Sequence, residues 1–330
     1  MGRNSPEGLL RLANNFMGSR ILLSAAELDL FTILNSGPLS AQEVANRIGA
    51  DIRALTVLLD ALSAMGLLIK RGESYRCTNS TSSILSKDTP NSVLPMVLHA
   101  AYLWKRWTNL TDVVQGTTVS NDGSKPYRSH EELSAFIEAM HVIAAPRAQE
   151  IVAAAHPGSA KALLDVGGAS GTYTIAFLRA VPGMKATLFD KPEVIEMARE
   201  RLRKEGMLDR VTLVPGDFYQ DELPAGNDLA FVSAIIHQNN SGQNLDLFNK
   251  VFRSLNRRGR ILIRDHVMEP DRIHPKEGAI FAVNMLLGTP GGNTYTFEEI
   301  ETGLSQAGFI DIRLLKKGEH MDGLVEAFKP

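Results

Sequence analysis

The sequence predicts an α/β protein in which a mainly helical winged-helix domain precedes a Rossmann-like, mainly parallel sheet. Two observations support this fold class. Up to about residue 155, apolar residues recur at helical spacing, with one short β-like interruption. From residue 162 onward, short apolar strands alternate with helices, which is the pattern of a parallel sheet covered on both faces.

The first part of the chain has the winged-helix order of three helices and a hairpin. The turn at Gly37-Pro38 separates the first two helices, and Ser40 and Asp51 have the positions of N-caps for the second and third. The polar residues 71–74 then lie between two short β-like runs, which indicates a hairpin. The predicted elements are helices over 21–30, Ala41–Ile48 and 51–65, and strands over 67–70 and 75–78.

Two long helices are expected next, over Val93–Val114 and Glu131–Ala154, with a Gly/Ser/Pro-containing loop between them. Pro157-Gly158 then separates the helical part from the first strand of the sheet. We therefore divide the chain into residues 1–110, 111–158 and 159–330.

The C-terminal part is predicted to end in an antiparallel hairpin. A helix over Phe297–Ala307 leads to Ile310–Leu315, and Gly323–Phe328 follows after only a few residues. Such a short connection leaves no room for a helical crossover, so the last two strands pair antiparallel. The earlier strands are expected over Ala162–Val166, Lys185–Phe189, Val211–Val214, Asp228–Ser233 and Arg260–Val267.

The strongest motif is the glycine-rich turn Asp165–Gly171, which ends a strand and opens a helix. It does not fit the dinucleotide pattern, because Ala169 and Thr172 occupy the second and third glycine positions counted from Gly167. It fits the form acid-x-Gly-x-(Gly/Ala)-x-Gly, which serves a sulfonium cofactor without a pyrophosphate. A tight strand-to-helix turn with no ligand is the structural alternative.

Two more acids end the next two strands. A carboxylate at Asp190 can accept both hydroxyls of a ribose, and Asp217 can accept an adenine amino group while Phe218 packs on the ring. Each alone is also consistent with a loop residue. Three acids at the carboxyl ends of three successive strands favour a nucleoside site, because ligands bind at that edge of such sheets.

At this point the sequence resembles the plant and bacterial small-molecule O-methyltransferases, the group that contains the caffeic acid and hydroxyindole O-methyltransferases. The resemblance covers nearly the whole chain. The matching segments are Asp165–Gly171, Asp190-Lys191-Pro192, Gly216–Tyr219, Ile235-Ile236-His237, and Pro290-Gly291-Gly292 followed by Phe297-Glu298-Glu299.

The resemblance implies a seven-stranded S-adenosylmethionine (SAM) domain at 159–330, a winged-helix domain at 1–110 that forms a homodimer, and a connector at 111–158 that lines the substrate site. It implies His237 as general base and no metal. The predicted cofactor-binding set is Asp165, Gly167, Gly168, Gly171, Asp190, Asp217, Phe218 and Ser233.

The chain departs from the family pattern at several positions. Gln238-Asn239 follow the histidine where the family often has Asp-Trp, and Ser233 replaces a basic residue. Of the two acids that often accompany the histidine, the first matches Asp265 and the second falls on Thr294. The substrate contacts are therefore expected to differ from those of a typical plant enzyme.

His237 and Asp265 are predicted to form the catalytic pair, because His237 comes just after one strand and Asp265 ends the strand beside it, both at the ligand-binding edge. If Asp265 accepts a hydrogen bond from one imidazole nitrogen, the other is free to take a hydroxyl proton. A complete, uncoupled transfer from a phenol to a histidine costs roughly 5 kcal/mol, so proton removal is expected to be concerted with methyl transfer. A structural loop histidine is the alternative.

The acceptor pocket is predicted from apolar and amide side chains, which suit a flat hydrophobic substrate. Core packing explains each of these residues equally well. The candidates are Phe136, Met140, Phe281, Asn284 and Met285. The atom that receives the methyl group is not encoded in any motif, so N-, C- or S-methylation is an alternative to O-methylation.

A DNA-binding regulator is the main non-enzyme alternative, because winged helices often bind DNA. With a net charge of −2, the protein has no excess positive charge to attract a polyanion such as DNA. In the candidate recognition helix, residues 51–65, the positive charge of Arg53 is offset by the negative charges of Asp51 and Asp60. The leucines of this helix suit burial. A helix for the major groove needs basic and amide side chains facing outward, so the sequence favours an enzyme without a nucleic-acid partner.

The remaining expectations concern location and metals. The single cysteine, Cys77, fits a reducing compartment, and neither a signal peptide nor an apolar run of membrane-spanning length is present. We expect a cytoplasmic protein that does not insert into a membrane. His266 and His274 near Asp265 suggest a metal site, but no Cys/His spacing of a zinc site is present.

Overall fold

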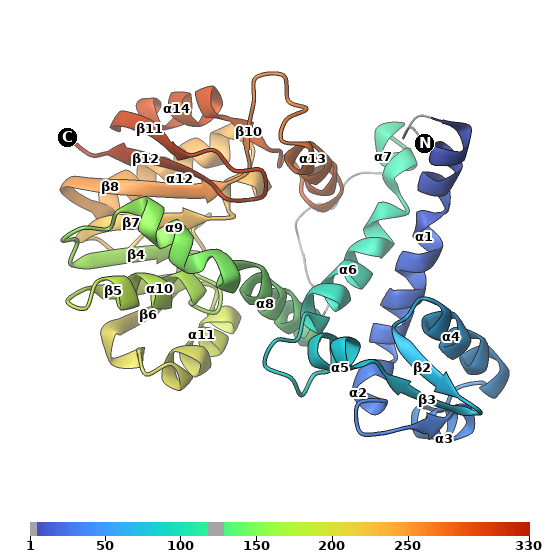
Figure 1. Ribbon diagram of the computed structural model, residues 1–330. Coiled ribbons are helices and arrows are strands. Elements are labelled where there is room, and N and C mark those ends of the chain that lie inside the picture. The colour runs from blue at the N-terminus through green and yellow to red at the C-terminus, as the bar shows by residue number, and fades with distance from the viewer. Residues whose placement is uncertain (1–4, 118–128) are drawn as a thin grey trace. The chain divides into compact units, whose positions relative to one another are not determined.

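The computed structural model describes residues 5–117 and 129–330 and divides them into two compact units (Figure 1). The described residues within 1–105 and 129–142 form one unit, and those within 106–128 and 143–330 form the other. These units do not follow the three segments predicted from the sequence. The difference arises because helix α8, His130–Ala144, packs mainly with the first unit rather than within a separate connector.

The first unit contains the predicted winged-helix order. Strands β2, Leu68–Arg71, and β3, Ser74–Cys77, form the hairpin, and β1, Leu39–Ser40, pairs antiparallel with β3. Both predicted caps are present, since Ser40 Oγ accepts from the Glu43 N–H at 3.2 Å and Asp51 Oδ1 from the Ala54 N–H at 2.8 Å. The helices are α1 Pro6–Glu27, α2 Leu30–Ile33, α3 Ala41–Ile48, α4 Ile52–Ala64, α5 Asn79–Leu85 and α6 Leu94–Trp107.

Both long helices predicted after the hairpin are interrupted, so those predictions were wrong in extent. The first ends at Trp107, and α7, Leu110–Val114, begins after Asn109. The second stops at Ala144, and a short 3₁₀ segment that contains Pro146 precedes α9, Ala148–Ala155. Asparagine favours helix ends, and proline lacks the N–H that a continuous helix needs.

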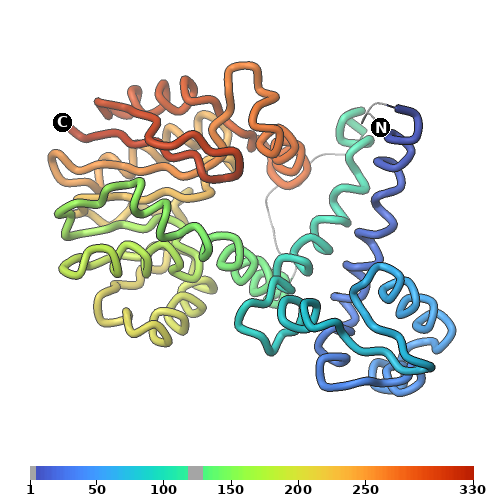
Figure 2. The backbone as a smooth tube through the Cα atoms, in the orientation of Figure 1, coloured from blue at the N-terminus to red at the C-terminus, as the bar shows by residue number. Residues whose placement is uncertain are grey.

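The second unit is built on a seven-stranded sheet with the order β11-β12-β8-β7-β4-β5-β6. Strands β4 to β8 are mutually parallel, and β12 pairs antiparallel with both β8 and β11, which confirms the predicted hairpin. Figure 2 shows the last strand beside β8. The strands are β4 Ala162–Val166, β5 Lys185–Asp190, β6 Val211–Pro215, β7 Asn227–Ser233, β8 Leu255–Asp265, β11 Ile310–Lys316 and β12 Gly323–Phe328.

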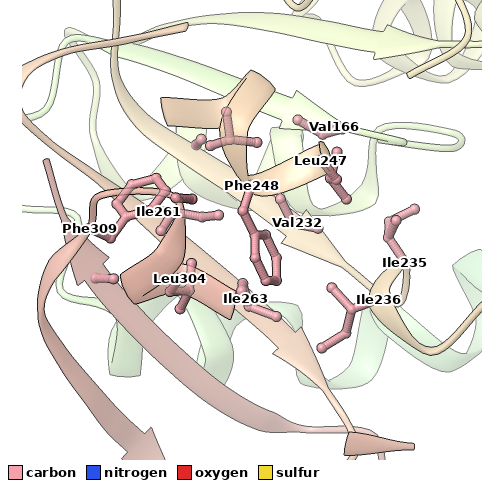
Figure 3. Close-up of a cluster of buried hydrophobic side chains, with 14 of the residues drawn as sticks. Val166, Val232, Ile235, Ile236, Leu247, Phe248, Ile261, Ile263, Leu304 and Phe309 are labelled. Carbon is pink, nitrogen blue, oxygen red and sulfur yellow. The ribbon is translucent and has the colours of Figure 1, made fainter. Parts of the chain in front are cut away.

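Helices cover both faces of the sheet because alternate strand side chains are apolar on each face. Val232 and Ile263 pack against Phe248 and Leu304 on one face (Figure 3). Phe231 on the opposite face packs against helices α9 and α10. The remaining helices are α10 Thr172–Ala180, α11 Pro192–Lys204, α12 Ser241–Ser254, α13 Lys276–Gly288 and α14 Phe297–Gln306.

The predicted strand Arg260–Val267 ends earlier, at Asp265, and Val267–Met268 forms a separate short strand β9 that pairs with β10, Tyr295–Thr296. Asp265 is therefore the last residue of β8, at the carboxyl edge of the sheet. Within the described part of the chain, none of the helices combines the length and apolar character needed to span a membrane.

Candidate active site

The strand order brings the predicted cofactor-binding and catalytic residues to one edge of the sheet in the second unit. Strands β5, β4, β7 and β8 are consecutive neighbours and run parallel, so their carboxyl ends meet at the same edge. Asp190 ends β5, the glycine-rich turn follows β4, Ser233 ends β7, and Asp265 ends β8. The sheet thus places the candidate cofactor residues beside the candidate catalytic acid.

The glycine-rich turn needs glycine at two positions because it packs closely against its neighbours. A Cβ at Gly167 would lie 2.6 Å from Cδ1 of Ile235, and the residue has a φ of +65°. A Cβ at Gly168 would lie 2.7 Å from Cγ of Leu188. The Ala169 N–H points out of this turn and donates to Oδ2 of Asp190 at 2.8 Å. The turn is therefore tied to the end of the next strand.

Asp165 lies beneath the turn rather than on its surface. Its side chain is buried, and Oδ2 accepts a hydrogen bond from Thr174 Oγ1 at 2.5 Å. Burial raises the pKa of Asp165 to about 6, although the bond from Thr174 acts in the opposite direction. This bond joins the end of β4 to the first turn of α10. A direct contact between Asp165 and a cofactor, expected from the sequence, stays a prediction.

Asp190 and Asp217 also have partners at the edge of the sheet. Asp190 Oδ1 accepts from the Lys191 N–H at 2.7 Å, and burial raises the pKa of this carboxyl. Asp217 Oδ1 accepts from the Tyr219 N–H at 2.9 Å, and the Phe218 ring lies 4.6 Å from that of Tyr219. Both carboxylates keep lone pairs free for a further donor.

His237 and Asp265 form a buried pair. Nδ1 of His237 lies 2.8 Å from Oδ1 and 3.0 Å from Oδ2 of Asp265, and Oδ1 also accepts from the His266 N–H at 2.8 Å. Burial acts to raise the pKa of Asp265, but the electrostatic interaction with His237 and its hydrogen bond outweigh burial and hold the pKa below its usual value. An ionised carboxylate thus fixes one nitrogen of the imidazole.

The segment that carries His237 is held by polar contacts that the sequence did not reveal. The side chain of Asn239 is buried and donates to Asn244 Oδ1 at 3.0 Å, and Asn244 donates to the Ile236 carbonyl at 3.0 Å. The Tyr295 hydroxyl donates to the Asn239 carbonyl. Asn239, where the family often has tryptophan, is therefore a buried connection between the histidine turn and α12.

Gly292 completes the support of His237 from another loop. A Cβ at this position would lie 2.5 Å from both the His237 carbonyl oxygen and Thr289 Oγ1. The Pro290-Gly291-Gly292 segment thus packs directly on the backbone of the histidine turn. Thr294 has the position at which the family often has its second acid. It is buried directly before β10, and its carbonyl accepts a hydrogen bond from Arg272 Nη1 at 3.2 Å.

The candidate acceptor residues fall into both compact units. Phe281 lies on α13 with its ring 4.9 Å from that of His237, nearly perpendicular, and 5.1 Å from that of His266. Asn284 Oδ1 on the same helix accepts from Trp107 Nε1 at 3.1 Å, and Met285 is buried. Phe136 and Met140 lie on α8 in the first unit. Their participation in an acceptor pocket stays a prediction.

The suggested metal cluster around Asp265 is not formed. Across residues 5–117 and 129–330, the structure contains no group of three His, Cys, Asp or Glu side chains arranged to hold a metal ion. His274 instead pairs with Asp271 at 2.7 Å on the surface, and His266 is buried against Phe281.

Comparison with known proteins decides the family. Residues 110–310 match the family model of an O-methyltransferase domain, and residues 10–87 match that of an O-methyltransferase dimerisation domain. The chain belongs to the O-methyltransferase family. This membership confirms the predicted enzyme class and fold. The winged-helix segment behind the DNA-binding alternative is the one that matches the dimerisation domain.

Relatives of this O-methyltransferase include two from Streptomyces. The 3-hydroxy-5-methyl-1-naphthoate 3-O-methyltransferase of Streptomyces sahachiroi is 30% identical over 94% of this chain and 91% of the relative. The tetracenomycin polyketide synthesis 8-O-methyltransferase of Streptomyces glaucescens is 32% identical over 93% of this chain and 92% of the relative. The crystal structure of human N-acetylserotonin methyltransferase in complex with SAM superposes with a TM-score of 0.84, at 26% identity and coverage of 100% and 99% of the two chains.

Proposed function

We propose that this O-methyltransferase transfers a methyl group from SAM to a hydroxyl of a small aromatic or polycyclic metabolite, with His237 as the general base. The observation that supports this most is the buried His237–Asp265 pair at the sheet edge, in the same row of strand ends as the glycine-rich turn. The names of the relatives support the substrate class, because they refer to a hydroxynaphthoate, a tetracenomycin polyketide and acetylserotonin.

SAM is the methyl donor, and when bound it supplies a methyl group on a positively charged sulfur. The site fits this group. Acidic side chains at the ends of β4 and β5 suit a cofactor without phosphates, and the turn between them requires glycine at 167 and 168. The buried hydroxyl of Ser170 has no hydrogen-bond partner in the described chain. The residues that would hold the cofactor are Asp165, Gly167, Gly168, Gly171, Asp190, Asp217, Phe218 and Ser233.

His237 and Asp265 divide the proton chemistry between them. With Nδ1 donating to the Asp265 carboxylate, Nε2 of the neutral imidazole carries a lone pair and accepts the acceptor's hydroxyl proton. The imidazolium that forms is stabilised by the buried negative charge of Asp265. The proton then leaves Nε2 for solvent, which restores the starting pair.

The acceptor ring is proposed to pack beside Phe281, which already contacts His237 edge-on. Asn284 and Met285 on the same helix would complete one wall. An apolar wall with few polar groups suits a flat aromatic substrate.

A matched acceptor screen tests the proposed function. The protein is incubated with methyl-labelled SAM and hydroxylated naphthoates, polycyclic aromatics and indoles, each paired with the amino and thiol analogue of the same ring. We expect label in the hydroxyl compounds, detected by mass spectrometry. Transfer to only the amino or thiol analogues would refute O-methylation, and fragmentation of each product locates the methylated atom.

We also propose that the protein is a homodimer formed through its N-terminal unit. The dimerisation-domain match begins on α1, and this helix exposes five large apolar side chains to between 50% and 68%. Such a cluster is costly to leave in water. These residues are Leu9, Leu10, Leu12, Phe16 and Met17.

The double substitution Leu12→Glu/Phe16→Glu is expected to shift the protein from dimer to monomer, because it places two charges in the proposed apolar interface. Light scattering coupled to size-exclusion chromatography measures the change. Ile273→Glu is the control, since Ile273 is 63% exposed in the other unit. A variant that stays dimeric at the same concentration as the wild type would contradict an interface on α1.

The proposed cytoplasmic location rests on the single cysteine, Cys77, which is buried and unpaired.

A further inference from the structure

Arg264 is a buried arginine that has no carboxylate partner among the described residues. It lies next to the last residue of β8 and is only 3% exposed. Nη1 donates to Ser233 Oγ at 3.2 Å, and the guanidinium lies 5.3 Å from the centre of the Tyr173 ring. Neither neighbour carries a negative charge, and Nε has no hydrogen-bond partner in the described chain.

The contrast with Arg260 on the same strand shows that this arrangement is unusual. Arg260 is also largely buried, and its Nη1 pairs with Glu326 at 3.0 Å while Nη2 donates to the carbonyl oxygens of Ala155 and His156. Buried charges in proteins are nearly always paired, because removing an unpaired charge from water is costly. Within the described part of the chain, Arg264 therefore lacks the anion that its burial demands.

The buried acids of the neighbouring elements are engaged elsewhere. Asp165 accepts from Thr174, and Asp322 pairs with Lys316 Nζ at 2.9 Å. An anion for Arg264 is thus expected to come from a bound ligand.

Two more polar groups without partners in the described chain lie at the start of α10 and in the turn before it, and one of them, Tyr173, contacts this arginine through its ring. The hydroxyl of Tyr173 and that of Ser170 are buried, and neither has a hydrogen-bond partner in the described part of the chain. The Tyr173 ring is held 5.0 Å from that of Phe231. Two hydroxyls and a guanidinium N–H can all donate. The charge of the guanidinium favours a negatively charged acceptor, and the Tyr173 hydroxyl can donate to the same group.

The position of the cluster identifies the part of the cofactor that it fits. Because it donates to Ser233, the guanidinium of Arg264 lies at the end of β7, the strand next to its own. One strand, β4, separates β7 from β5, which ends at Asp190. Two inter-strand spacings amount to roughly 10 Å. The nucleoside end of SAM is assigned to Asp190, and its other end is an aminocarboxypropyl arm that carries the cofactor's carboxylate.

We propose that Arg264, with the Tyr173 hydroxyl, binds the carboxylate at the methionine end of SAM. This inference rests on the proposed function. The guanidinium offers a planar pair of donors that matches a carboxylate, and stacking on Tyr173 keeps it in place. Arg264 is a cofactor-positioning residue in this assignment, and it takes no part in proton transfer.

Calorimetric titration with two ligands tests the assignment without turnover. S-adenosylhomocysteine has the carboxylate, and its decarboxylated analogue lacks only that group. We expect the wild type to bind the analogue about 10- to 100-fold more weakly, the usual effect of losing a charge-assisted hydrogen bond. Arg264→Gln should weaken S-adenosylhomocysteine by a similar factor and leave the affinity for the analogue nearly unchanged.

Arg260→Gln is the matched control, because it removes a buried arginine from the far end of the same strand. It should lower the melting temperature but keep the preference for the carboxylate. If Arg264→Gln does not fold, Tyr173→Phe takes its place, since it removes a single hydroxyl. This variant should reduce the preference for S-adenosylhomocysteine over the decarboxylated analogue severalfold. The comparison of the two ligands on the wild type needs no variant.

Equal affinity of the wild type for both ligands would overturn the inference, as would a preference that persists in Arg264→Gln. A wild type that binds neither ligand would instead refute the proposed SAM site.

Discussion

His237→Ala is expected to lower the rate of methyl transfer by about 100- to 10,000-fold, the usual contribution of a positioned general base. The loss should appear in kcat, because the acceptor's proton has no other base in its place. Affinity for S-adenosylhomocysteine should stay within a factor of a few, since His237 lies beyond the proposed nucleoside contacts. A labelled-methyl assay and calorimetry measure the two effects.

His156→Asn is a suitable control for the loss of a histidine. His156 is exposed at the end of α9 with a φ of +44°, a conformation that asparagine tolerates. This variant should keep full activity. Near-full activity in His237→Ala would remove the base role, whereas loss of S-adenosylhomocysteine binding together with turnover would indicate that His237 instead supports the cofactor site.

Asp265→Asn is expected to have the next largest effect, lowering kcat roughly 100-fold or more, by analogy with other carboxylate–histidine pairs. The substitution preserves the size of the side chain but removes the buried charge that stabilises the imidazolium. It also places an amide N–H where the imidazole or the His266 N–H now donates. The KM for the acceptor should change much less than kcat, because Asp265 is buried behind His237.

Two measurements separate this catalytic effect from a loss of stability. Asp228→Asn removes a carboxylate that accepts from the backbone N–H groups of Lys161 and Ala162 at the opposite end of the sheet, so it should affect unfolding but not kcat. The double variant His237→Ala/Asp265→Asn should lose little more activity than His237→Ala alone, because the two residues act as a unit. Additive losses would show that Asp265 acts independently of His237.

Much of the fold was predictable because it follows from local periodicity. Helical spacing in the first part and the alternation of strands and helices after residue 162 were sufficient for the two architectures. The short link between β11 and β12 required antiparallel pairing. The two long helices were predicted as continuous, but they are interrupted near Asn109 and Pro146. An apolar pattern can continue across residues at which the helix itself stops.

The pairing of His237 with Asp265 was also predictable, because residues that follow the carboxyl ends of parallel strands meet at one edge. The polar contacts that support this pair could not be predicted from the sequence. Asn239 and Asn244 lie only five residues apart, but Tyr295 comes from a distant segment, and nothing in the spacing of the three shows that they meet behind the histidine turn.

By itself, then, the sequence determined the sheet, the glycine-rich turn and the chemical types available at its edge, because backbone periodicity and turn geometry are local properties. The tertiary structure alone decided which buried polar groups are satisfied. Arg260 and Arg264 are the same residue type on one strand, yet among the residues that the structure describes only the first finds a carboxylate. Whether a buried charge is paired depends on the side chains that distant segments bring within about 4 Å of it, and local sequence does not encode that distance.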